Sequence, residues 1–345
     1  MTRVEVAVVG GGVVGAATAR TLARAGRSVL LLEQFRLGHK RGSSHGSARI
    51  FRLSYPEVRY VEMAKDALGL WRQLESETGR RLLTTTGGLD TGPSIDLHAS
   101  ALAQCGVSFE ILDSSTARSR FPRLRLPDGP VLYQFGAGVL AADLAVRTLV
   151  ESAVDHGAEV REEVKVEALE LRDPGVHLIT PEGAIVAETA VVAAGAWSKS
   201  LLAAAGIDLT VKATRETVAY FRLANELSFP TLVDWVEPSF YSLPAPGLGI
   251  KAGLHRAGPP TDPDVPAGVA PDAVHRLTEI VTRRYPDADP SPHLSETCIY
   301  TNTDDQSFIL ERHGPIVVGS ACSGHGFKFA PVTGEILARL VSESP

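Results

Sequence analysis

The first 33 residues join an apolar strand to a glycine-rich turn, a helix and a second apolar strand. Residues 4–9 form the β-branched apolar run that is expected of a buried parallel strand. Gly10, Gly12 and Gly15 follow in G-x-G-x-x-G spacing, and the second strand ends at Glu33. This order of elements predicts a dinucleotide-binding unit with a Rossmann-like α/β fold.

Each residue type in this turn has a physical reason. Gly10 permits the tight turn, Gly12 lets the backbone approach a pyrophosphate, and Gly15 brings the helix close to the sheet. The N-terminus of the helix adds partial positive charge. Glu33 can accept hydrogen bonds from both ribose hydroxyls, and its charge would repel a 2′-phosphate. The spacing alone does not distinguish FAD from NAD.

The sequence after Glu33 bears on that choice. Residues 36–55 are rich in Gly, Ser, His and Arg and are too polar for a third buried strand, which an uninterrupted NAD-binding domain would need. An apolar strand returns only at 190–194, followed by Gly195 and Trp197. This pattern favours a nucleotide domain that is assembled from separated pieces. An NAD-dependent reductase remains the disfavoured alternative.

Composition excludes several other classes of protein. A chain of 345 residues exceeds one core, which predicts two domains or one elaborated domain. The net charge of −6 and the lack of a basic tract argue against binding to nucleic acid or to a membrane surface. No apolar run approaches the ~18 residues of a membrane span, and the first residues lack a signal-peptide pattern, so we expect a cytoplasmic protein. Three cysteines without paired spacing predict neither a disulfide framework nor a metal site.

Four blocks of sequence carry a resemblance that covers nearly the whole chain. They are residues 5–33, "GSSHGSARIFRLSY" at 42–55, "CIYTNTDDQSFIL" at 298–310 and "GSACSGHGFKFAPVTGEIL" at 319–337. With these blocks the sequence resembles the monomeric sarcosine oxidase family, which includes N-methyltryptophan and pipecolate oxidases. That family lies within the glycine/D-amino-acid oxidase group of flavoproteins. The resemblance implies FAD as the cofactor.

The resemblance gives Cys298 a chemical role. A buried cysteine is usually a small apolar side chain, and that is the reading we expect for Cys105 and Cys322. Family members commonly join FAD to a cysteine at the position of Cys298, by addition of the thiolate to the flavin 8α-methyl group. The resemblance therefore implies an 8α-S-cysteinyl bond, with Cys322 near the ring but unreactive. It also implies flavin contacts from Ser43, Gly195, Trp197, Gly324, Gly326, Phe327 and Lys328.

A cluster of cations predicts an anion-binding site. Arg49 and Arg52 stand three residues apart among apolar neighbours, so the segment is expected to be buried, although a solvated cluster is the alternative. A buried guanidinium needs an anionic partner. The resemblance implies that Arg52 and Lys328 clamp the carboxylate of the substrate, for which a planar two-pronged donor is well suited. It places Arg49 and His45 against the flavin.

A second lysine, Lys251, also has apolar neighbours and is expected to be buried. The resemblance places it beside flavin N5, where its charge would assist the reduction of oxygen by electrostatic preorganisation. Tyr241 and His255 match positions that line the substrate side. Trp235 and Glu237 are expected near the entrance of the pocket, where they would affect substrate size.

These residues together predict FAD-dependent oxidation of a small N-methyl or cyclic secondary amino acid to an imine, with O2 reduced to H2O2. The alternatives are an FAD-dependent dehydrogenase that passes electrons to a quinone or protein acceptor, and a non-enzymatic flavoprotein subunit. Because one chain carries every part, we expect a monomer whose partners are the amino acid and O2.

The expected architecture is α/β, with an FAD-binding Rossmann-like domain and an α+β substrate domain built on an antiparallel sheet. The FAD-binding domain is expected to be discontinuous, at 1–85, 140–215 and 297–345. The substrate domain would comprise 86–139 and 216–296, with a helix over "PDAVHRLTEIVTRRYP" that stops before Pro286.

Overall fold

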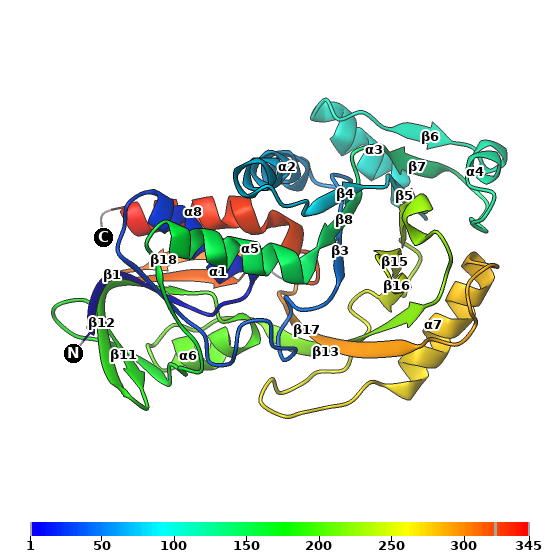
Figure 1. The fold of residues 1–345 in the computed structure, drawn as a ribbon. Helices are drawn as coiled ribbons and strands as arrows, with labels where there is room; N and C mark the ends of the chain where they lie inside the picture. Colours follow the sequence, from blue (N-terminus) through cyan, green and yellow to red (C-terminus); the bar gives the residue numbers. More distant parts are fainter. Residues whose placement is uncertain (1, 321–322, 344–345) are drawn as a thin grey trace.

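Two eight-stranded sheets and one three-stranded sheet make up the fold in the computed structural model, which describes residues 2–320 and 323–343 (Figure 1). The first sheet lies at the left of Figure 1 and the second at the right. The α/β fold class with a largely antiparallel second sheet is confirmed.

The first sheet has the order β10-β11-β12-β1-β2-β9, and β19 pairs with β12 and β18. Its strands are β1 (Thr2–Val9), β2 (Val29–Leu32), β9 (Glu159–Arg161), β10 (Ala168–Leu171), β11 (Val176–Thr180), β12 (Gly183–Val192), β18 (Ile309–His313) and β19 (Ile316–Ser320). β1 runs parallel to both β2 and β12 at the centre of this sheet, and its last four residues are buried. Of the strand expected at 190–194, residues 190–192 are the end of a longer strand, β12, and residues 193–194 lie beyond it.

The second sheet has the order β17-β13-β16-β15-β14-β5-β7-β6. Its strands are β5 (Gly88–Thr91), β6 (Glu110–Leu112), β7 (Val131–Gln134), β13 (Lys212–Phe221), β14 (Thr231–Asp234), β15 (Phe240–Ala245), β16 (Gly249–Leu254) and β17 (Leu294–Asn302). All neighbours in this sheet are antiparallel except β14 and β5, which are parallel. β13 and β17 run across the expected domain boundaries at 215/216 and 296/297, and those boundaries stay a prediction.

The third sheet has the order β3-β8-β4. Its strands are β3 (Ala48–Phe51), β4 (Leu83–Thr85) and β8 (Gly138–Ala141). β3 arises inside the segment 36–55 that looked too polar for a buried strand. It does not join the nucleotide sheet, because it pairs with β8 instead, and its buried ends are Ala48 and Phe51.

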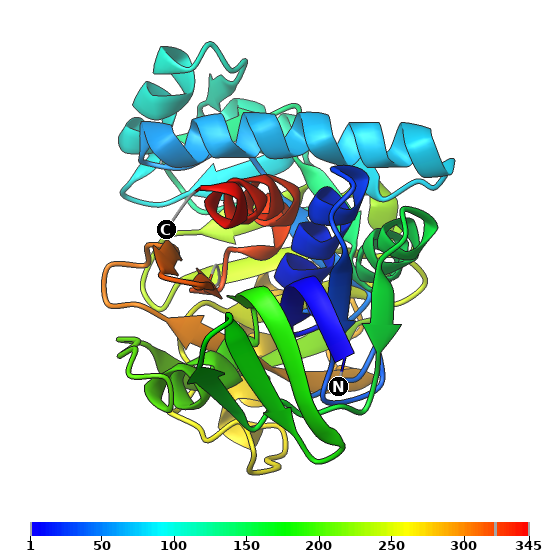
Figure 2. The ribbon, with the colours of Figure 1, turned by 90° about the vertical axis from the view of Figure 1, so that its left-hand side faces the viewer.

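The helices pack on the faces of these sheets. They are α1 (Val13–Arg24), α2 (Val58–Thr78), α3 (Ile95–Gln104), α4 (Ser114–Arg120), α5 (Ala142–Asp155), α6 (Ser198–Ala203), α7 (Pro271–Arg284) and α8 (Ala330–Ser342), with short 3-10 turns η1 (Gly195–Trp197), η2 (Glu226–Ser228) and η3 (Phe327–Phe329). α7 ends before Pro286 as predicted and buries Leu277 and Val281 against the second sheet. α1, α2 and α8 lie together over the first sheet (Figure 2).

Small residues allow α1 to approach its neighbours closely. A Cβ atom at Gly15 would lie 1.9 Å from the carbonyl oxygen of Gly10, and one at Gly334 of α8 would lie 2.8 Å from the carbonyl carbon of Ala17. Neither position can hold a larger residue unless the backbone moves. Gly15 thus acts by packing the helix against the turn, as the spacing predicts.

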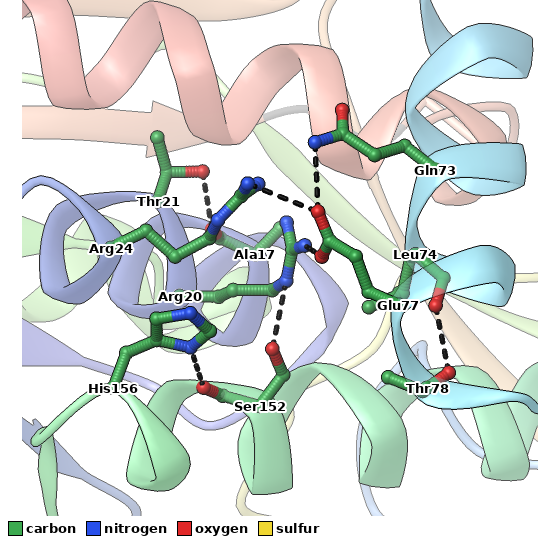
Figure 3. Close-up of polar contacts among 10 residues, drawn as sticks. All are labelled: Ala17, Arg20, Thr21, Arg24, Gln73, Leu74, Glu77, Thr78, Ser152 and His156. Atoms are coloured by element: carbon green, nitrogen blue, oxygen red, sulfur yellow. Dashed lines mark hydrogen bonds and ion pairs between the residues drawn. The ribbon is translucent and has the colours of Figure 1, made fainter.

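A polar cluster joins α1, α2 and α5 (Figure 3). The guanidinium of Arg20, whose side chain is 7% exposed, pairs with Glu77 and donates to the Ser152 hydroxyl at 3.0 Å. Arg24 reaches the same carboxylate at 3.0 Å, and Gln73 donates to it at 2.8 Å. One carboxylate therefore neutralises two arginines between packed helices.

We predict that Glu77→Gln lowers the free energy of unfolding by about 1–3 kcal/mol, because Arg20 would stay buried without its counter-charge. Denaturant unfolding of the variant measures this difference. The control is Asp128→Asn, which removes the partner of Arg118 at an exposed surface pair and should cost less than about 1 kcal/mol. Equal losses in the two variants would contradict the prediction.

Candidate active site

A cavity with a volume of about 1040 Å³ extends from the glycine turn after β1 to residues of the second sheet. Nearly all of the sequence-predicted site residues line it. They are Gly10, Gly12, Glu33, Ser43, His45, Arg49, Arg52, Gly195, Trp197, Tyr241, Lys251, His255, Cys298, Gly324, Gly326, Phe327 and Lys328. Residues that are far apart in the sequence are thus brought to one enclosed space.

The part of the cavity at the first sheet has the geometry of a nucleotide-binding site. It consists of the glycine turn after β1 and Glu33, and is called the cradle below. Gly10 has a φ of +108°, and a Cβ atom there would lie 2.5 Å from the carbonyl oxygen of Ala193, so only glycine fits. The Glu33 carboxylate is 5% exposed and accepts hydrogen bonds from the amides of Gly11 at 2.7 Å and Phe35 at 3.0 Å. These two amides fix the acid at the end of β2.

The loop after β2 covers the N-terminus of α1. The Ser44 hydroxyl accepts a hydrogen bond from the amide of Val13 at 3.0 Å, and the Ser43 hydroxyl donates to the carbonyl of Ile299 in β17. The loop therefore connects the nucleotide cradle to the strand that carries Cys298. A cradle without side chains, an acid at the end of β2 and a long cavity fit an extended dinucleotide such as FAD.

Arg49 is held by the backbone of its own loop. Its guanidinium donates to the carbonyls of Ala48 at 2.9 Å, Ser43 at 2.8 Å and His45 at 2.6 Å. The guanidinium carbon also lies 5.5 Å from the centre of the Phe327 ring. Arg49 therefore fixes the turn between the cradle and β3 and brings a positive charge to the wall of the cavity.

Lys251 lies in β16, between β13 and β15, and is 5% exposed. Its ammonium donates to the carbonyl of Ala48 at 3.2 Å. Burial, followed by the charge of Arg49, lowers the pKa of Lys251 to about 7. This lysine can therefore gain or lose a proton near neutral pH.

Cys298 is half-buried in β17, opposite Glu216 of β13. It lines the cavity and lies close enough to Tyr241 and Lys251 to influence the pKa of both. Cys105 is buried at the end of α3 and is not among the lining residues. Cys322 lies outside the described residues.

Arg52 and Lys328 both line the cavity, and they lie close enough together for the charge of Arg52 to act on Lys328. Arg52 is 8% exposed, and its Nη1 has no hydrogen-bond partner in residues 2–320 and 323–343. Lys328 is 5% exposed and donates to the Tyr55 hydroxyl at 2.8 Å and the His325 carbonyl at 3.0 Å. Burial and then the charge of Arg52 hold the pKa of Lys328 well below its usual range. Within the described part of the chain neither cation forms an ion pair, so the site favours an anionic ligand.

Tyr241 and His255 also line the cavity, Tyr241 near Cys298 and Arg49 and His255 near Arg52 and Lys328. Burial and then Cys298 raise the pKa of Tyr241, so its hydroxyl stays protonated. Burial and then Arg52 lower the pKa of His255 to about 4, and burial and then Arg49 lower that of His45 to about 4. At neutral pH both imidazoles are therefore uncharged.

Sequence reasoning gave no role to Tyr55, which supports Lys328, or to Tyr300, which lies 5.8 Å from the His255 ring. Both residues fall inside the sequence blocks that carry the family resemblance, and this location is the sequence signal that could have identified them. Trp235 lines the cavity as expected, whereas Glu237 is exposed and is not a lining residue.

Among residues 2–320 and 323–343, no helix combines the length and the hydrophobicity that a membrane span requires. These residues also contain no group of three or more His, Cys, Asp or Glu side chains that could hold a metal ion.

Comparison with known proteins gives a consistent result. The family described as FAD dependent oxidoreductase (DAO) matches residues 5–340. Peroxisomal sarcosine oxidase of Homo sapiens is 36% identical over 358 residues, which cover 96% of this chain and 90% of that protein. Monomeric sarcosine oxidase of Bacillus sp. (strain B-0618) is 31% identical over 359 residues, covering 98% and 92%. The open form of NikD, described as an unusual amino acid oxidase essential for nikkomycin biosynthesis, superposes with a TM-score of 0.90 at 28% identity, covering 99% and 95%.

Proposed function

The chain belongs to the DAO family of FAD dependent oxidoreductases, and from its sarcosine oxidase-like character we propose that it oxidises a small N-methyl or cyclic secondary amino acid with O2. The pair of buried cations, Arg52 and Lys328, carries this proposal. A carboxylate would neutralise both, and it would leave the amine of an amino acid further along the same cavity.

FAD fits this cavity because the glycine turn after β1 and the acidic residue after β2 match the needs of a dinucleotide. Gly10, Gly12 and Glu33 would hold the adenine dinucleotide, and the segment Gly324–Phe327 would lie against the ring. When bound, FAD would supply a two-electron acceptor for the hydrogen on the carbon next to the amine nitrogen, and O2 would take up the reducing equivalents. In the balanced reaction the amino acid loses one hydrogen from carbon and one from nitrogen, O2 becomes H2O2, and water hydrolyses the imine.

The residues of the chain supply binding and electrostatics. Arg52 can meet the carboxylate with two parallel N–H donors, and Lys328 can add a third contact. The same positive charges disfavour the protonated form of the substrate amine and so keep its lone pair available. Neutral His255 and protonated Tyr241 would orient that amine, and no protein base is required. Lys251 would place a positive charge where oxygen gains negative charge.

We predict a covalent thioether between Cys298 and the flavin. Its support is the position of this half-buried thiol on the cavity wall, near the cations Lys251 and Arg49 that can stabilise negative charge on the ring. Acid precipitation should give a yellow pellet for the wild-type protein and a white pellet for Cys298→Ser. Cys105→Ser, which alters a cysteine outside the cavity lining, is the control and should stay yellow. A white wild-type pellet would rule out the bond.

The proposed reaction is tested by a peroxide-coupled screen of N-methyl and cyclic amino acids under air. We expect peroxide with at least one secondary amino acid, and no peroxide with the matching amine that lacks a carboxylate. Substrate-dependent bleaching of the flavin without peroxide would instead favour the dehydrogenase that uses a quinone or protein acceptor. The absence of bleaching with every secondary amino acid would refute the proposed substrate class.

A further inference from the structure

The guanidinium of Arg52 packs against two aromatic rings in the wall of the cavity. Its central carbon lies 4.1 Å from the centre of the Tyr55 ring and 4.9 Å from that of the Trp235 ring. The Trp235 ring in turn lies 5.0 Å from the ring of His98, at an interplanar angle of 32°. Contacts between a guanidinium and aromatic faces leave its N–H edge available, and the edge is the part that binds carboxylates.

Trp235 is held firmly in this position. Its amide donates to the carbonyl of Thr91 at 2.9 Å, and its indole N–H donates to the carboxylate of Asp90 at 2.9 Å. Gly92 adopts a φ of +108°, and a Cβ atom there would lie 3.1 Å from the Trp235 nitrogen, so the turn after β5 makes room for the tryptophan. The parallel pairing of β5 and β14 places these segments side by side.

The carboxylate that binds the Trp235 indole N–H belongs to a buried acid, Asp90. Asp90 is 2% exposed, and within the described ranges it forms no ion pair, although it lies close enough to Arg52 for the charges of both to act on the pKa of His98. An indole that accepts the guanidinium on its ring and binds the carboxylate through its N–H connects the two groups without letting them meet. A buried ion pair between Asp90 and Arg52 would otherwise be strongly attractive.

We propose that Trp235 is a positioning residue that keeps Arg52 apart from the buried carboxylate of Asp90 and so reserves the guanidinium for the carboxylate of the substrate. This inference rests on the proposed function for the identity of the ligand. It assigns Trp235 a role in substrate affinity through Arg52, and it makes Asp90 the internal competitor of the substrate.

The test first replaces Trp235, which separates Arg52 from Asp90, and then also removes the charge of Asp90. Trp235→Leu should allow Arg52 to pair with Asp90 and should raise KM for the secondary amino acid roughly tenfold or more, with kcat changed less than about twofold. The double variant Trp235→Leu/Asp90→Asn should return KM to within about threefold of the wild-type value. A tryptophan that merely supported the fold would not be rescued by a change at Asp90.

Three further variants complete the set. Trp235→Phe keeps a ring over Arg52 and should change KM only about two- to threefold. Val236→Ala, at the next residue, which is 57% exposed, is the matched control and should change nothing. Asp90→Asn alone should leave substrate affinity unchanged or tighten it, and it keeps the test decisive if Trp235→Leu fails to fold. Weaker substrate binding in Asp90→Asn would overturn the inference.

A binding measurement separates this inference from the proposed reaction. Cyclopentanecarboxylate and its neutral carboxamide, which lack an oxidisable amine, are titrated into the FAD-loaded protein, and the flavin absorbance is followed. Trp235→Leu should weaken carboxylate binding roughly tenfold and leave carboxamide binding unchanged, and the double variant should restore it. That result would support the inference even if no amino acid were oxidised. Unchanged carboxylate binding in Trp235→Leu, or no recovery in the double variant, would refute it.

Discussion

A Lys251→Met variant is expected to take electrons from its substrate under nitrogen at nearly the wild-type rate and to return them to O2 about 10²–10³ times more slowly. Oxygen gains negative charge in that second half-reaction, and the ammonium of Lys251 would be a positive charge fixed beside it. Methionine has a similar length but carries no charge. Stopped-flow absorbance of the flavin separates the two half-reactions.

The pKa of Lys251 adds a dependence on pH to this prediction. Because burial and Arg49 lower the pKa to about 7, the ammonium is present below that value and is lost as the pH rises through it. Wild-type reoxidation should therefore slow between about pH 6 and about pH 8, while the rate of Lys251→Met should stay flat. Lys212→Met, at a side chain that is 72% exposed, is the control. Normal reoxidation in Lys251→Met would remove this role.

Arg52→Gln is expected to lower kcat/KM for the secondary amino acid by about 10²–10³, because it removes a buried charge that would pair with the substrate carboxylate. The loss should appear mainly as a rise in KM. Glutamine keeps hydrogen-bonding capacity, so the variant tests charge and planarity more than volume. Steady-state peroxide production over a range of substrate concentrations gives both constants.

Arg59→Gln is the matched control for Arg52→Gln. Arg59 also lies against a tyrosine ring, 4.7 Å from the centre of Tyr60, but its side chain is 57% exposed and pairs with Glu57. Its replacement should change kcat/KM less than about twofold. If Arg52→Gln behaved like Arg59→Gln, the carboxylate would bind elsewhere and the proposed substrate clamp would be wrong.

Local sequence was enough to predict the cradle. The φ of Gly10 and the close approach at Gly15 are demanded by a strand that turns directly into a helix, so the spacing itself encodes the geometry. The helix over residues 271–284 was predicted for the same reason, since its period and the following proline are local features. Family resemblance added the positions of Lys251 and Cys298, which no local pattern could assign to a flavin.

The segment 36–55 shows where local reasoning stops. Its composition suggested a loop, yet part of it forms β3, because residues 138–141 offer a strand for it to pair with. Strand pairing between distant segments depends on the partner as much as on the segment itself, so composition cannot determine it. The expected domain boundaries at 215/216 and 296/297 fall inside β13 and β17, which pair with each other, and they stay a prediction.

The sequence by itself determined the cradle and the FAD-dependent family, and it singled out the residues that we propose to bind the acid, because these depend on spacing and on side-chain type. Only the tertiary structure decided how those residues are supported. Tyr55 and Lys328 are 273 residues apart, and Asp90 and Trp235 are 145 apart, yet each pair is hydrogen-bonded. Such contacts follow from the pairing of strands and the docking of helices. The free energy of these interactions is distributed over the whole core, so no single segment of the sequence encodes them.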